Sequence, residues 1–144
     1  MSLAASAMVV GLIGATGAAA ALSFQFDRAS ARPGTFVVAS QPGFDVTGVI
    51  VYFVPTRPPG VTPDPAGDYF LRKPPERHAI RLGTPHLTSS GRLSIRFRVP
   101  RVAPGNYTTA FWCTTCAKGG DFFASVLWDT PWTGRPGGVL RVTR

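Results

Sequence analysis

The sequence has few acidic side chains, and none of the common catalytic motifs. Its seven Asp and Glu residues are scattered and stand mostly beside turn-forming residues, so no pair of carboxylates belongs to a recognisable catalytic motif. A Gly-x-Ser-x-Gly elbow, a phosphate-binding loop and a metalloprotease helix are also absent. The sequence therefore predicts a protein that is not an enzyme and that uses no cofactor.

Charge is missing from the beginning of the chain, where the first 26 residues carry no ionisable side chain. An apolar run over residues 7–15 is followed by the small residues Ala18 to Ala21. This order is typical of a secretory signal, although no Lys or Arg stands at its start. We predict a helical signal peptide over residues 1–21 and a secreted or extracytoplasmic, envelope-associated protein. A retained anchor and a mis-assigned start codon are the alternatives, and the run is short for a transmembrane helix.

Lysine is rare and arginine abundant. The chain has 15 Lys and Arg residues, of which 13 are Arg, and a formal net charge of +8. A cationic protein attracts polyanions. Because export removes access to cytoplasmic nucleic acid, we expect acidic envelope polymers, anionic lipid or another surface protein as partners, and not nucleic acid. A GC-rich genome is the alternative explanation for the arginines.

After the signal segment no stretch has a helical period. Short β-type runs recur instead between Pro-Gly, Ser-Gly and Gly-Gly pairs. The expected strands are 23–26, 34–39, 48–54, 78–82, 92–99, 106–113, 122–128 and 139–143. About seven or eight strands in one domain over residues 22–144 indicate an all-β, antiparallel β-sandwich.

The strand expected over residues 92–99 has the clearest pattern. Leu93, Ile95, Phe97 and Val99 alternate with polar residues, so one face of this strand should lie on the core. The other face should carry a basic stripe. The candidate polyanion-binding residues are Arg92, Arg96, Arg98 and, just beyond the strand, Arg101.

The segment over residues 55–77 contains seven prolines, and we expect it to form a long loop without a regular element. The strand before it, Val49 to Val54, is apolar on both faces and needs a cover on each. The apolar cluster Asp68 to Leu71 predicts that the loop folds partly back on the sheet. The loop would either decorate the domain or contact a ligand.

The two cysteines, Cys113 and Cys116, are three positions apart, next to Trp112. In an exported protein this spacing favours a structural disulfide that fixes the turn after a strand. The alternative is a thiol-disulfide oxidoreductase, but Gly119 and Gly120 would break the helix that lowers a catalytic cysteine pKa. A metal site with His78 or His86 is a third alternative. It is not favoured, because an oxidising compartment removes the thiolates and His86 suits an ordinary surface position.

Tryptophans are the remaining candidates for ligand contact. Trp112 and Trp128 are expected to fill the core, whereas Pro131, Gly134 and Pro136 surround Trp132 and favour its exposure. With Arg135 nearby, Trp132 is the candidate aromatic contact for a sugar or a polyanion.

Two stretches carry a family pattern. Residues 94–125 run from a strand ending in Val99-Pro100, through Pro104-Gly105-Asn106-Tyr107, to the cysteine-bearing strand, after an opening strand at Pro33 to Val38. This pattern resembles secreted bacterial, mainly actinobacterial, immunoglobulin-like domains. The resemblance implies a sandwich with Tyr107 at a corner before the penultimate strand. No cysteine lies in an early strand, so an inter-sheet disulfide is not possible. The resemblance implies no catalytic residue, and the expected function is an exported binding or structural module at the cell envelope.

Overall fold

The computed structural model of the chain describes residues 24–42, 48–62, 69–71, 78–113, 122–125 and 129–144. Within them the protein is all-β, and no helix is present that could cross a membrane. In chain order the strands are β1 (Gln25–Phe26), β2 (Ser30–Ala31), β3 (Phe36–Pro42), β4 (Val49–Pro55), β5 (Tyr69–Leu71), β6 (Ile80–Gly83), β7 (His86–Leu87), β8 (Arg92–Arg98), β9 (Gly105–Cys113), β10 (Phe122–Ser125) and β11 (Leu140–Val142). The predicted signal peptide, residues 1–21, lies outside the described residues.

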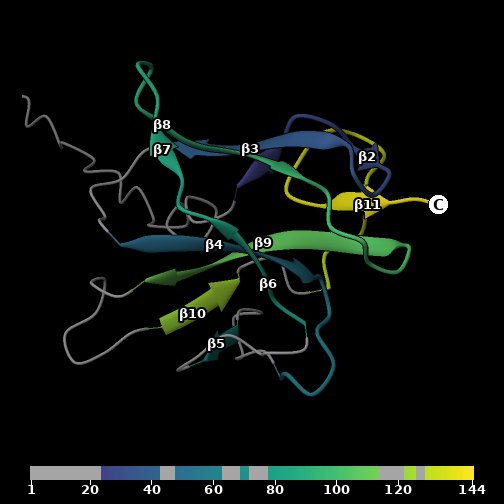
Figure 1. Cartoon of the computed structure of the whole chain (residues 1–144). Helices are drawn as coiled ribbons and strands as arrows, with labels where there is room; N and C mark the ends of the chain where they lie inside the picture. Colours follow the sequence, from purple (N-terminus) through teal and green to yellow (C-terminus); the bar gives the residue numbers. More distant parts are fainter. Residues whose placement is uncertain (1–23, 43–47, 63–68, 72–77, 114–121, 126–128) are drawn as a thin grey trace, which may run out of the picture.

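The strands form two sheets that lie one above the other in Figure 1. The first is a four-stranded antiparallel sheet in the order β1-β3-β8-β7. Its longest pairing joins β3 to β8 over seven residue pairs, from Phe36 opposite Arg98 to Pro42 opposite Arg92. β8 alternates apolar and polar residues. On β3 the side chains of Val37, Ala39 and Gln41 are fully buried, whereas Phe36, Val38 and Ser40 on the opposite face are exposed or partly buried.

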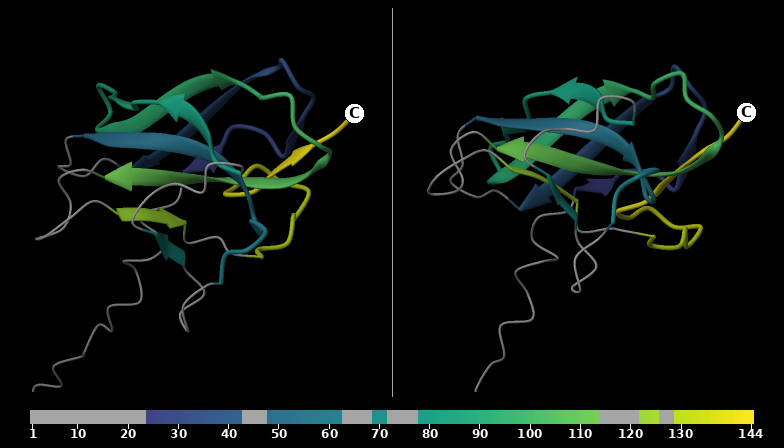
Figure 2. Two further views of the ribbon diagram at one scale, coloured as in Figure 1. Left: turned by 60° about the horizontal axis from the view of Figure 1, so that its bottom comes forward. Right: turned by 90° about the horizontal axis from the view of Figure 1, so that it is seen from below.

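The second sheet has seven strands and is built around β9. One edge of β9 pairs with β4 from Tyr107 to Cys113. The other edge is shared, because β11 pairs with its first residues and β10 with its last. Beyond these lie β6 next to β4, β5 next to β10, and β2, which runs parallel to β11. Figure 2 shows the two sheets from below and at an intermediate angle.

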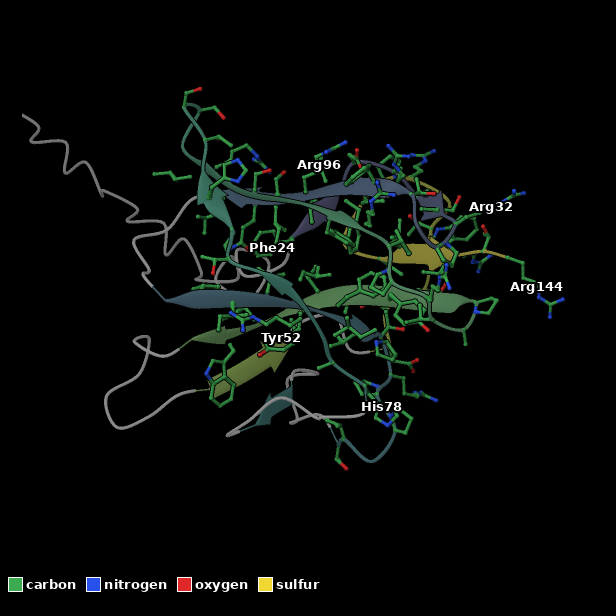
Figure 3. All side chains as sticks on the ribbon, viewed as in Figure 1. Phe24, Arg32, Tyr52, His78, Arg96 and Arg144 are labelled. Atoms are coloured by element: carbon green, nitrogen blue, oxygen red, sulfur yellow. The ribbon has the colours of Figure 1, made fainter. Side chains whose placement is uncertain are left out.

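The core lies between the two sheets and is dominated by aromatic rings. The ring of Phe53 from β4 stacks on Tyr107 from β9 with 4.8 Å between the ring centroids. It also meets Phe26 and Phe97 of the other sheet at 6.5 and 5.7 Å. Phe24 is labelled between the two layers in Figure 3. Burying one such side chain stabilises the fold by about 1.5–3 kcal/mol. Because the rings come from both sheets, their burial holds the two sheets together.

Tyr107 occupies a corner. Its hydroxyl donates a hydrogen bond of 2.8 Å to the carbonyl of Ala103, in the connection between β8 and β9. Burial raises the pKa of this hydroxyl above its ordinary value. Tyr107 thus ties the beginning of β9 to the connection that precedes it.

All eight segments predicted to be strands contain one. Three short strands, β2, β5 and β7, were not expected. The expectation that residues 55–77 hold no regular element is wrong, because β5 lies inside this segment and pairs with β10. Strands of two or three residues are too short to show a period of two in the sequence. They form because the backbone of a longer neighbouring strand has unpaired N–H and C=O groups at its edge.

Candidate functional site

The outer face of the four-stranded sheet carries a cluster that we call the basic face. It consists of Phe36, Val38 and Ser40 from β3 and Arg92, Arg96 and Arg98 from β8. These side chains share a face because Phe36 stands opposite Arg98, and Val38 stands opposite Arg96. In Figure 3 Arg96 lies on the side of this sheet away from the second sheet. Three of the four predicted polyanion-binding residues are thus on one surface.

Phe36 is the residue that organises the basic face. Its side chain is 38% exposed, and the guanidinium carbons of Arg96 and Arg98 lie 3.7 and 4.3 Å from its ring centroid. A guanidinium group at this distance is attracted to the ring by about 0.5–1 kcal/mol at an exposed site. The ring therefore holds two cations close together on an open surface.

Hydrogen bonds fix two of these arginines further. Nη2 of Arg92 donates to the hydroxyl of Ser40 at 3.2 Å, and Arg92 is half-buried. Nη1 of Arg98 donates to the carbonyl of Gly34 at 3.4 Å. A guanidinium group has five N–H donors, so each of these contacts leaves donors for a ligand.

The basic face has an excess of positive charge. In the described part of the chain the acidic side chains are Asp27 and Asp129, and they form ion pairs with Arg28 and Arg57. Asp27 borders the basic face, because one of its carboxylate oxygens accepts a hydrogen bond from the backbone N–H of Val38 at 3.2 Å. Neither ion pair includes an arginine of the basic face. Among the described residues, the guanidinium groups of the basic face therefore have no acidic partner.

The fourth predicted residue, Arg101, is not brought to this cluster by any observed contact. It is exposed and lies in the connection after β8, where the alternation of that strand has ended. Phe36 was the residue that the sequence analysis missed. The available signal was that Phe36 stands next to Val37, so the two side chains point to opposite faces of the strand. Which arginines lie beside Phe36, however, depends on how β3 pairs with β8.

Trp132 is partly buried and is engaged within the domain. Its indole N–H donates to the carbonyl of Ala29 at 2.8 Å, and the guanidinium carbon of Arg141 lies 3.8 Å from its ring. Arg141 also donates from Nε to the side-chain oxygen of Asn106 at 3.4 Å. The arginine beside the ring is thus Arg141, whereas Arg135 was expected. Contact of Trp132 with a ligand stays a prediction, and its N–H already has a partner.

The cysteine segment is described only in part. Cys113 ends β9 and stands opposite Val49 on β4 and Phe122 on β10. Cys116 and the turn around it lie outside the described residues. The structural disulfide and the alternative dithiol site therefore both stay predictions. Among the described side chains, no three His, Cys, Asp or Glu residues gather as metal ligands would.

The second sheet has a different outer surface, which we call the covered face. Val54 and Ala110 are 0% and 1% exposed there, and four partly buried side chains pack against them. These four are Tyr52, Trp112, Val61 and Ala79. Trp112 is thus in this small outer cluster, whereas we expected it in the main core. The described beginning of the Pro-rich segment folds back as predicted, since Val61 belongs to it; Trp128 lies outside the described residues.

Two contacts hold the segments over the covered face. The backbone N–H of Asp129 donates to the carbonyl of Thr56 at 2.7 Å, and the side chain of Asp129 pairs with Arg57. They join the start of the Pro-rich segment to the chain before Trp132. On the covered face Val54 and Ala110 are therefore closed to solvent, whereas Tyr52 and Trp112 beside them stay partly buried.

Comparison with known proteins identifies no relative. No family model matches the chain, and no curated protein or solved structure matches it.

Proposed function

We propose that the chain is an immunoglobulin-like β-sandwich that acts as a non-catalytic binding or structural module at the cell envelope. The strand order supports the fold. The order β1-β3-β8-β7 corresponds to the A-B-E-D sheet of such domains, and β11-β9-β4-β6 to the facing sheet G-F-C-C′. The corner hydrogen bond of Tyr107 supports the same assignment.

The ligand that we propose is an acidic polymer of the envelope, bound by the basic face. The observation that carries this proposal is the pair of guanidinium groups on Phe36, neither of which has an acidic partner in the described part of the chain. Charge complementarity of this kind raises the rate and the specificity of association. Because the arginines are exposed, salt should weaken the binding.

Charge reversal on the basic face tests this proposal. The double variant Arg96→Glu/Arg98→Glu should be retained on an envelope preparation at least about tenfold more weakly at low salt than the unchanged chain. The matched control is Arg81→Glu/Arg144→Glu. It makes the same change in net charge at two exposed positions, Arg81 on β6 and Arg144 after β11.

Retention is measured as the bound fraction at rising NaCl concentrations, and the melting temperature shows that each variant is folded. The proposal predicts that the control keeps most of its retention. Equal losses in both double variants would show that only net charge matters, and no loss in either would show that the basic face is not used. Either result would contradict the proposed site.

A further inference from the structure

We infer that Phe36, Arg96 and Arg98 form a binding site for one phosphate group, so that the ligand of the basic face is a phosphate-bearing polymer. The choice of polymer rests on the proposed function. The phosphate site itself rests on the side-chain geometry.

The two arginines are close enough to bind one anion together. Their guanidinium carbons lie 3.7 and 4.3 Å from the same ring centroid, so they are at most 8.0 Å apart. A phosphate held between two guanidinium groups by hydrogen bonds of about 2.8 Å needs a separation of roughly 8 Å or less. This upper limit is compatible with one phosphate group that meets both side chains and removes the repulsion between them.

The number of donors favours phosphate over carboxylate. One guanidinium fork already matches the two oxygens of a carboxylate. A phosphate monoester offers three unesterified oxygens. A diester offers two, as a carboxylate does, but they project from a tetrahedral phosphorus, so a second guanidinium group can donate from outside the plane of the first. Arg98 has N–H donors besides the one in its hydrogen bond to the Gly34 carbonyl. Arg96 lies over the Phe36 ring and donates no hydrogen bond to another described residue. Two guanidinium groups beside one another therefore suit a tetrahedral phosphate better than a planar carboxylate.

Phe36 is a positioning residue in this site. Its ring contributes no hydrogen bond to an anion, but it holds both guanidinium groups against one surface. Removing the ring while keeping both charges should therefore weaken the binding of a single phosphate group. It should have less effect on the general attraction of a polyanion.

The first experiment uses the full chain and small probes. Glycerol phosphate, dimethyl phosphate and glucuronate are titrated while the Nε–H signals of the arginines are followed by NMR. We expect saturable shifts of the Arg96 and Arg98 signals with both phosphates, and binding of glucuronate at least fivefold weaker. Equal binding of glucuronate, or shifts spread evenly over all exposed arginines, would overturn the phosphate site.

Three variants complete this test. Phe36→Leu keeps every charge and should bind glycerol phosphate about fivefold more weakly than the unchanged chain. Arg98→Gln should lose the binding, whereas Arg101→Gln, with the same loss of charge three positions away, should keep it. Unchanged phosphate affinity in Phe36→Leu, with an unchanged melting temperature, would contradict the role of the ring.

A second experiment identifies the source of the phosphate. Retention of the full chain is compared on immobilised linear polyphosphate and on phosphatidylglycerol vesicles, with Phe36→Leu in both arms. Stronger retention on the polymer, reduced in the variant, supports a polymer ligand. Retention on vesicles alone would overturn it. If envelope retention survives Arg96→Glu/Arg98→Glu while glycerol phosphate still shifts the arginine signals of the unchanged chain, the proposed function fails and the phosphate site stands.

Discussion

On the outer face of the four-stranded sheet, arginines lie over one exposed phenylalanine, whereas on the outer face of the seven-stranded sheet apolar side chains lie beneath connecting segments. Figure 3 shows one residue of each: Arg96 and Tyr52 lie on opposite outer sides of the two layers. Phe36 is 38% exposed on the basic face, whereas Val54 is fully buried on the covered face. Among the described residues, the covered face thus holds a second, small apolar cluster, whereas the basic face is an exposed, positively charged surface.

The same substitution on the two faces should give the largest difference. Val54→Lys places a charge in the apolar cluster of the covered face and should destabilise the protein by about 3 kcal/mol or more. Val38→Lys lies on the basic face, half-buried and opposite Arg96. This variant should lose no more than about 1 kcal/mol of stability, because the lysine charge stays in water although it stands opposite Arg96.

Chemical denaturation measures both free energies of unfolding, and Val38→Lys has a second readout. Its extra charge should strengthen retention on linear polyphosphate at low salt. A loss of stability in Val38→Lys as large as that in Val54→Lys would show that the basic face is not an open surface.

The strands and the basic stripe could be predicted because a period of two is a local property of the sequence. Arg96 and Arg98 follow from the alternation of one strand. The contact between Phe36 and these arginines could not be predicted, because it depends on the register between β3 and β8, which are distant in the sequence.

The tryptophans show the same limit. The sequence does not tell which face of β9 points between the sheets, and Trp112 falls on the outer one. Arg141 reaches Trp132 because β11 pairs with β9 and places Arg141 opposite Asn106, a pairing that nothing near Trp132 in the sequence indicates.

The interior differs from both outer faces in its response to pH. Burial raises the pKa of the Tyr107 hydroxyl above its ordinary value of 10.0. The contribution of this hydroxyl to stability is therefore fully present below pH 10. It is lost as the pH rises through the folded-state pKa, because the unfolded chain releases the proton first.

Tyr107→Phe should remove this pH dependence and also the hydrogen bond to Ala103, at a cost of about 1 kcal/mol at pH 7. Unfolding free energies at pH 8, 10 and 11 measure both effects. The unchanged chain should lose more stability than the variant between pH 8 and 11. Parallel losses in the two proteins would contradict the role of Tyr107.

Two neighbouring threonines of β9 give the smallest and most specific test of the covered face. Thr108 points toward that face, is fully buried, and donates from its hydroxyl to the carbonyl of Gly138 at 2.9 Å. Thr109 points the other way into the core, and its buried hydroxyl has no hydrogen-bond partner among the described residues. Valine has nearly the same shape as threonine, so each replacement changes little but the hydroxyl.

Thr109→Val should stabilise the protein by about 1 kcal/mol, because it removes an unpaired polar group from the core. Thr108→Val should destabilise it by about 1 kcal/mol, because the Gly138 carbonyl loses its donor in a place that the connecting segments close to water. On an open surface water would replace the lost donor, and Thr108→Val would be close to neutral. The sign and size of the Thr108→Val effect, measured by denaturation beside Thr109→Val, therefore tell whether the covered face excludes water as a core does.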